Sequence, residues 1–196
     1  MGFNIVTVNK IRDRFKSPPR PAIWTDAPEK DWNNWIWQQQ KRIKAMEQLE
    51  KVITVTDEEH QAYKESHEMF NMGITPYYAS LMDPNDPNCP IRLQSVPKAG
   101  ELNILDSDLE DPLGEERDMP VPGITHRYPD RVLFYTTHNC PVYCRHCTRK
   151  RKVSDPSSSA ANAQLEEGLK YISEHKEIRD VVISGGDPLS NSDDRL

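Results

Sequence analysis

Apolar side chains recur at helical spacing in the first half of the chain, between residues 31 and 53. They follow one another at steps of three, four and seven, with glutamine, lysine and glutamate between them. This spacing places them on one face of an α-helix. The positions are Trp32, Trp35 or Ile36, Ile43, Met46, Leu49 and Ile53. The pattern predicts one amphipathic helix, which the tryptophans Trp32, Trp35 and Trp37 anchor on a partner surface.

A second helix is predicted from Thr56 towards Phe70. The segment Thr56-Asp-Glu-Glu59 fits a capping box, in which the first and last residues satisfy each other's backbone N–H groups. Gly73 is expected to lie near its end. A short element at residues 74–82 and one or two helical turns within residues 93–105 complete this helical region.

The pattern changes after residues 106–123, an acidic stretch rich in proline and glycine that we interpret as a long surface loop. Val132–Thr136 has the β-branched and aromatic character of a buried strand, and Val181–Ile183 is a second such run. A helix between them is indicated by the spacing of Leu165, Leu169 and Ile172. Strand, helix and strand in this order predict one βαβ unit, so the fold class is α/β.

The composition excludes several classes of protein. The chain has 196 residues, of which 36% are hydrophobic, and no run approaches the roughly 20 apolar residues of a membrane span. The start lacks the pattern of a signal peptide, so we expect a cytoplasmic protein with no membrane partner. The net charge of -6 argues against nucleic acid as a partner, since a negatively charged protein is repelled by phosphates. The basic run Arg149–Lys152 is a local exception, and it is too short to bind nucleic acid alone.

Three of the four cysteines form the motif Cys140-Pro-Val-Tyr-Cys144-Arg-His-Cys147 directly after the first predicted strand. Cubane iron–sulfur clusters and structural zinc normally take four protein ligands, so three thiols suggest a metal centre with an open position. A zinc site completed by His138 or His146 is the alternative, although no second C-x2-C pair is present. Cys89 lies in a proline-rich turn and is interpreted as a structural thiol.

The second predicted strand runs into the turn Ser184-Gly-Gly-Asp-Pro-Leu189. Gly185 and Gly186 allow a ligand to approach the backbone closely, and the Asp187 carboxylate is suited to accept hydrogen bonds from an ammonium group. Following a cysteine-bearing loop, this turn indicates a ligand site.

In both features the sequence resembles the radical S-adenosylmethionine (SAM) enzymes, and from about residue 30 to its end it resembles the lysine 2,3-aminomutase family more closely. That resemblance rests on Asp31-Trp-Asn-Asn-Trp-Ile-Trp, Gly73-Ile-Thr-Pro-Tyr-Tyr78, Asp111-Pro-Leu-Gly, Pro120-Val-Pro-Gly, His126-Arg-Tyr-Pro-Asp-Arg131, Cys144-Arg-His-Cys-Thr-Arg149 and Ser184-Gly-Gly-Asp187. Two pairs depart from the family pattern, His138-Asn139 and Asp187-Pro188, and indicate a relative with another substrate.

The resemblance implies an isomerase that moves an amino group from C2 to C3 of an amino acid. In the family a 5′-deoxyadenosyl radical made from SAM starts the reaction, and the amino acid is held as an imine of pyridoxal phosphate (PLP). Lysine is the first expected substrate; a glutamate enzyme and a protein-lysine-modifying relative are the enzymatic alternatives. A zinc-stabilised binding module is the alternative of another class.

The resemblance also assigns roles to residues. Cys140, Cys144 and Cys147 would hold a [4Fe–4S] cluster; Gly185, Gly186 and Asp187 would bind SAM; Arg127 and Tyr128 would meet the PLP phosphate; Arg149 would pair with the substrate carboxylate. The family's PLP lysine has no match in this chain, so the catalytic residues are unknown.

In the fold that the resemblance implies, a helical N-terminal region precedes the first βαβ part of an incomplete radical SAM (β/α) barrel. We expect a basic, proline-rich arm at residues 1–28, the helical region and its loop at 29–123, and the start of the barrel at 124–196. Two strands cannot close a barrel, so we interpret the chain as an N-terminal fragment that is inactive alone. The whole protein is expected to be a homo-oligomer that uses an electron donor.

Overall fold

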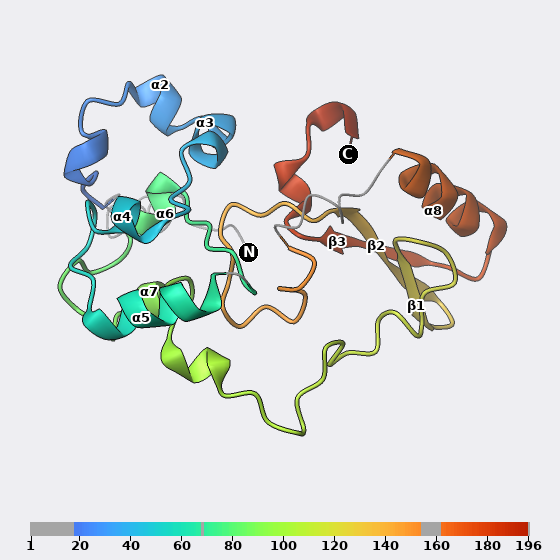
Figure 1. Ribbon diagram of the computed structural model, residues 1–196. Coiled ribbons are helices and arrows are strands. Elements are labelled where there is room, and N and C mark those ends of the chain that lie inside the picture. The colour runs from blue at the N-terminus through green and yellow to red at the C-terminus, as the bar shows by residue number, and fades with distance from the viewer. Residues whose placement is uncertain (1–17, 68, 154–161, 196) are drawn as a thin grey trace, which may run out of the picture.

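The structure is a computed structural model, and it describes residues 18–67, 69–153 and 162–195. Figure 1 shows a group of short helices on one side and a small sheet with one long helix on the other. Most of the predicted arm, residues 1–17, lies outside the described residues. The helices of the first group are α2 (Glu29–Trp32), α3 (Trp35–Gln40), α4 (Met46–Leu49), α5 (Asp57–Ser66), α6 (Pro76–Ser80) and α7 (Pro90–Leu93), with 3-10 turns at Ala22–Trp24 and Ala99–Leu102.

The single long helix predicted for residues 31–53 is wrong, because the chain turns twice within it. Asn34 starts a new helix by accepting a hydrogen bond from the backbone N–H of Ile36 at 2.8 Å. Further along, Ile43 leaves helical geometry and exchanges two backbone hydrogen bonds with Ile74, at 2.8 and 3.0 Å. The predicted apolar positions still form the core, since Ile43, Met46, Leu49 and Ile53 are at most 4% exposed.

The tryptophans of this region divide between the interior and the surface. Trp32 is buried and packs against the rings of Trp24, Trp37 and Tyr77, with ring centroids 6.2 to 6.5 Å apart. Trp35 remains 47% exposed. Trp32 therefore anchors α2 within its own chain. Of the three tryptophans predicted to contact a partner, only Trp35 is exposed enough to do so.

Helix α5 begins with the predicted capping box. The Thr56 hydroxyl accepts the Glu59 N–H at 3.3 Å, and the Glu59 carboxylate accepts the Thr56 N–H at 2.9 Å. The helix ends at Ser66, one turn before the predicted end at Phe70. Glu59 also forms a fully buried ion pair with Arg92 of α7, so the capping residue ties α5 to a distant helix.

Replacing Thr56 with alanine is expected to lower the free energy of unfolding by about 1 kcal/mol, because the Glu59 N–H loses its acceptor. A thermal melt of the protein should move down by roughly 2–4 °C. Thr54→Ala is the matched control, since its exposed hydroxyl contacts only Asn85 at 3.3 Å, and it should cost less than about 0.5 kcal/mol. Equal shifts for the two variants would contradict the capping role.

The second group contains the predicted βαβ unit. Strands β2 (Arg131–Thr137) and β3 (Asp180–Gly185) are parallel, and α8 (Asn162–Glu174) lies between them in the chain. Sequence patterning did not predict β1 (Ile124–Tyr128), which pairs antiparallel with β2 and gives the order β1-β2-β3. The side chains between sheet and helix are apolar: Ile124, Val132 and Phe134 from the sheet pack with Leu165, Tyr171 and Ile172 of α8.

The strands form a small mixed sheet in which β1 and β3 are the two outer strands. Within the described residues β3 has no second neighbour, and its side chains Val181, Val182 and Ile183 are exposed. These three strands do not close a barrel, so the predicted barrel stays a prediction. In the described part of the chain, no helix is both long enough and apolar enough to cross a membrane.

The loop that leaves β2 docks on the helical region (Figure 1). Val142 forms an antiparallel bridge with Ile74, and the Tyr143 N–H donates to the Gly73 carbonyl at 2.8 Å. A side chain at position 73 would collide with the Tyr143 ring, because a Cβ there would lie 2.7 Å from it. Backbone hydrogen bonds between the helical region and this loop, which lie on opposite sides of the predicted domain boundary, therefore hold the loop in place.

Candidate metal centre

The three cysteines of the motif lie on the loop after β2 and are each partly buried. Burial raises the pKa of Cys140 to about 11 against the opposing backbone hydrogen bond from Asp187, and the charges of Cys147 and Asp187 add to the rise. Burial and Cys147 also raise the pKa of Cys144. The thiols are thus close enough to influence one another, and binding a metal ion would require them to lose their protons.

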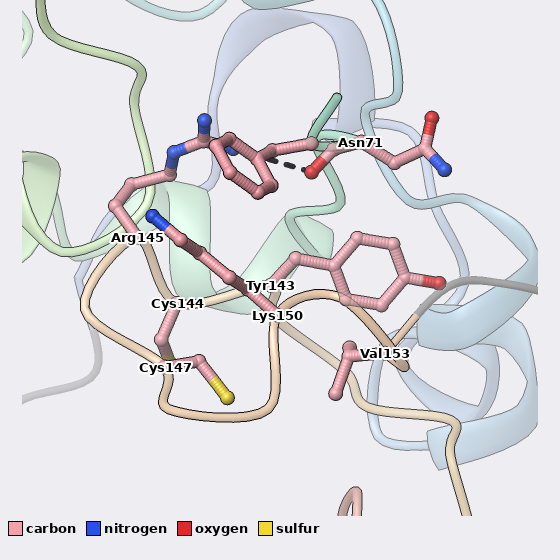
Figure 2. Close-up of a pocket in the computed structure, with 8 residues that line it drawn as sticks. Asn71, Tyr143, Cys144, Arg145, Cys147, Lys150 and Val153 are labelled. Atoms are coloured by element: carbon pink, nitrogen blue, oxygen red, sulfur yellow. Dashed lines mark hydrogen bonds between the residues drawn. The ribbon is translucent and has the colours of Figure 1, made fainter. Parts of the chain in front are cut away.

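Two of the thiols border a small pocket against the helical region. Figure 2 shows Cys144 and Cys147 on the same loop, with Arg145 reaching across to the Asn71 carbonyl at 3.2 Å. The backbone N–H of Arg149 donates to the Cys147 sulfur at 3.4 Å. The pocket is further lined by Phe70, Tyr143, Lys150 and Val153.

The donor set fits an iron–sulfur cluster with one open iron, because one loop offers three thiols. Among the described residues, no three histidine, cysteine, aspartate or glutamate side chains are already gathered for metal binding. The alternative zinc site would need His138 or His146 as its fourth ligand. His138 stacks on the Tyr135 ring at 6.2 Å, and His146 is exposed.

The Gly-Gly-Asp turn lies directly beside the cysteine loop. The Gly186 N–H donates to the Thr137 carbonyl at 2.6 Å, and the Asp187 N–H donates to the Asn139 carbonyl at 2.8 Å. Both bonds end within three residues of Cys140, so the structure brings together the two features that the sequence linked.

The glycines of this turn are needed for contact with the cysteine loop. Gly185 has a φ of +116°, and a Cβ on Gly186 would lie 2.3 Å from the Asn139 carbonyl oxygen. The close approach that these glycines allow is therefore made by the backbone of the cysteine loop; the predicted approach of a ligand is not tested by it. Asp187 accepts the Leu189 N–H at 3.1 Å through one oxygen and caps a 3-10 turn. The SAM-binding role of Gly185, Gly186 and Asp187 stays a prediction.

Arg149, the predicted partner of a substrate carboxylate, is paired with Glu115 in this structure. Its Nε donates to one Glu115 oxygen at 2.9 Å and its Nη2 to the other at 2.5 Å. The guanidinium also lies 5.1 Å from the centre of the Tyr135 ring. Burial alone would lower the pKa of Arg149, but the hydrogen bonds and charge of Glu115, together with Tyr135, outweigh burial and raise it.

Glu115 is a site residue that sequence reasoning missed. It lies in the predicted surface loop but is only 8% exposed. Burial raises the pKa of its carboxyl, yet hydrogen bonds from Arg149 and Tyr135 bring the net value below the ordinary one. The one available signal was its place directly after the motif Asp111-Pro-Leu-Gly. The loop therefore contributes a buried carboxylate to the surroundings of the cysteines.

Arg127 and Tyr128 lie away from this group, at the opposite end of β2. Tyr128 pairs with Arg131 at the start of β2, whereas the cysteines follow its last residue, Thr137. Arg127 donates to the Asp118 carboxylate at 2.6 Å, and Tyr128 is 58% exposed. The structure does not bring these two residues together with the cysteine loop, so their contact with a PLP phosphate stays a prediction.

Comparison with known proteins places these features in a family. Residues 127–196 match the family described as "4Fe-4S single cluster domain". The chain is 48% identical to L-lysine 2,3-aminomutase of Bacillus subtilis (strain 168) over 174 residues, which are 89% of this chain and 37% of that protein. It is also 48% identical to L-lysine 2,3-aminomutase of Clostridium subterminale over 177 residues, 90% of this chain and 42% of that protein.

A further relative is named for another amino acid. Glutamate 2,3-aminomutase of Clostridioides difficile (strain 630) is 45% identical over 168 residues, 86% of this chain and 40% of that protein. The chain spans less than half the length of each of these relatives. Over this matched stretch, the chain belongs to the lysine 2,3-aminomutase family.

Proposed function

We propose that the protein is a radical SAM 2,3-aminomutase, which moves the amino group of a free amino acid from C2 to C3. One structural observation carries the proposal. The three-cysteine loop and the Gly-Gly-Asp turn are hydrogen-bonded to each other at the carboxyl ends of the adjacent parallel strands β2 and β3. Active sites of βα proteins form at this end of the strands. The names of the relatives support lysine as the first substrate.

Within this proposal, Cys140, Cys144 and Cys147 hold the cluster, which when bound supplies the electron that cleaves SAM. The Asp187 N–H donates to the Asn139 carbonyl at 2.8 Å, next to Cys140, and we propose that the Asp187 carboxylate orients an ammonium group beside the cluster. PLP remains an expectation from the resemblance, and so does the contact of Arg127 and Tyr128 with its phosphate.

Arg149 is suited to hold the substrate carboxylate while it keeps its bond to Glu115. A guanidinium carries five N–H donors that form more than one fork. Glu115 uses the fork made by Nε and Nη2, and the donors of Nη1 lie outside that fork. We propose that the donors outside this fork bind a second carboxylate end-on, with the guanidinium already oriented by its hydrogen bonds with Glu115 and Tyr135.

The proposal is tested on the full-length protein, reconstituted with iron and sulfide under anaerobic conditions. Incubation with SAM, PLP, a reductant and lysine should yield the β-amino acid, which chromatography detects. In a parallel incubation with glutamate, a β-amino acid product that lysine does not give would select the glutamate enzyme. An enzyme with a full cluster that isomerises neither amino acid would overturn the proposal.

A one-electron donor must reduce the cluster, and we propose a cytoplasmic homo-oligomer as the working form. Size-exclusion chromatography with light scattering measures the oligomeric state. A monomer that is fully active would contradict that part.

A further inference from the structure

We propose that Arg42 is a positioning residue for the cysteine loop, which fixes the backbone at Cys140 from the helical region so that the thiols can take up the cluster. The inference rests on the cluster assignment and not on the substrate. Arg42 lies outside residues 127–196, the part of the chain that matches the iron–sulfur family. It lies between α3 and α4, where the long helix predicted from the sequence is interrupted.

One nitrogen of Arg42 contacts three acceptors on the loop. Its Nη1 donates to the Asn139 side-chain oxygen at 3.1 Å, to the Cys140 carbonyl at 2.5 Å and to the Tyr143 hydroxyl at 3.1 Å. These acceptors lie before, at and after the first cysteine. A single cation therefore fixes the direction of the backbone through Cys140.

The guanidinium is itself held in place. Its Nε donates to the Gln39 carbonyl at 3.1 Å, and its carbon lies 5.1 Å from the centre of the Tyr143 ring. That ring is in turn packed against Gly73. Because both ends of the planar group are engaged, it presents Nη1 to the loop in one orientation.

A second arginine anchors the loop after Cys144. Arg145 is buried, pairs with Glu101 at 2.8 Å and donates to the Asn71 carbonyl, while its backbone N–H donates to the Gln94 carbonyl at 2.8 Å. The segment between the first two cysteines is thus fixed at both ends by the helical region. Arg42 fixes the end of this segment at Cys140, where the Gly-Gly-Asp turn also contacts the loop.

The test measures cluster retention in the complete protein. Wild type, Arg42→Met and Arg42→Lys are reconstituted anaerobically, and the rate of iron loss to a chelator is followed. Arg42→Met keeps a long side chain but has no donor, so iron loss should accelerate about tenfold, which corresponds to about 1.4 kcal/mol. Arg42→Lys should be intermediate, because an ammonium keeps the charge without the fork.

Arg20→Met is the matched control. Arg20 also belongs to the N-terminal part, lies 4.8 Å from the Trp32 ring, donates to the Ala27 carbonyl and pairs with Glu29, all of which lie outside the cysteine loop. Its rate of iron loss should stay within about twofold of wild type, as for a surface substitution. Equal rates in Arg42→Met and Arg20→Met would overturn the inference.

Tyr143→Phe tests the same contact from the loop and remains decisive if Arg42→Met misfolds. Removing its hydroxyl removes one acceptor, so iron loss should accelerate about threefold, and adding Arg42→Met should then have a smaller effect than in wild type. An unchanged rate in Tyr143→Phe, or effects that simply multiply, would overturn the inference. None of these readouts needs turnover, so an inactive protein that holds its cluster contradicts only the proposed function.

Discussion

Alanine in place of Cys140, Cys144 or Cys147 is expected to reduce the iron content of the reconstituted protein from about four atoms per chain to less than about one. Each thiol supplies one of only three protein ligands in the proposed site, so the loss of one leaves two, too few to hold a cubane cluster. Iron and sulfide analysis measures the loss, and aminomutase activity should disappear with it. This is the largest effect that we expect from a single substitution.

Cys89→Ala is the control for that experiment. Cys89 is buried in the helical region and accepts the Asp83 N–H at 3.3 Å, so its loss should leave the iron content unchanged. Recovery of about one zinc and no sulfide from anaerobic wild-type protein would instead identify the structural zinc site. That result would remove both the cluster and the proposed reaction.

The sheet region could be predicted because its signals are local. The strand predicted at Val132–Thr136 is β2 with one residue added at each end, and Val181–Ile183 lies within β3. β-Branched runs separated by a helical pattern imply a βαβ unit, and parallel pairing then places the cysteine loop beside the Gly-Gly-Asp turn. The neighbourhood of these two features follows from topology alone.

The helical region shows where local patterns are not enough. The apolar spacing correctly predicted which side chains form the core, but not that Ile43 pairs with Ile74, a partner far along the chain. The stabilisation from that pairing and from the cap at Asn34 exceeds the free energy that a continuous helix would have contributed. Tertiary contacts override helix periodicity in this way whenever a break still buries the same side chains.

The partners of the site were missed for the same reason. Arg42 and Glu115 lie 98 and 34 positions from the residues that they bind, and no spacing rule connects such positions. Glu115 also stands in a stretch whose composition indicates a solvated loop. A charged residue in such a stretch becomes a candidate for a buried contact only once the structure shows what covers it.

The pair of Arg149 and Glu115 leads to the second large effect. In the complete enzyme, Arg149→Lys is expected to lower kcat/KM for the amino acid about 100-fold, which corresponds to about 2.7 kcal/mol. An ammonium has no planar fork, so it cannot bind Glu115 side-on and a substrate carboxylate end-on at the same time. The loss should appear mainly as a raised KM, with iron content unchanged.

Arg151→Lys is the matched control, because Arg151 belongs to the same basic run but pairs with the exposed Glu116 at 2.9 Å. Its kcat/KM should remain within about twofold of wild type. Glu115→Gln tests the orienting role separately: it keeps the size of the side chain but removes its charge, and KM should rise about three- to tenfold. If Arg149→Lys leaves KM unchanged, Arg149 does not hold the carboxylate, and its bond to Glu115 serves only to fix the acidic loop on the sheet.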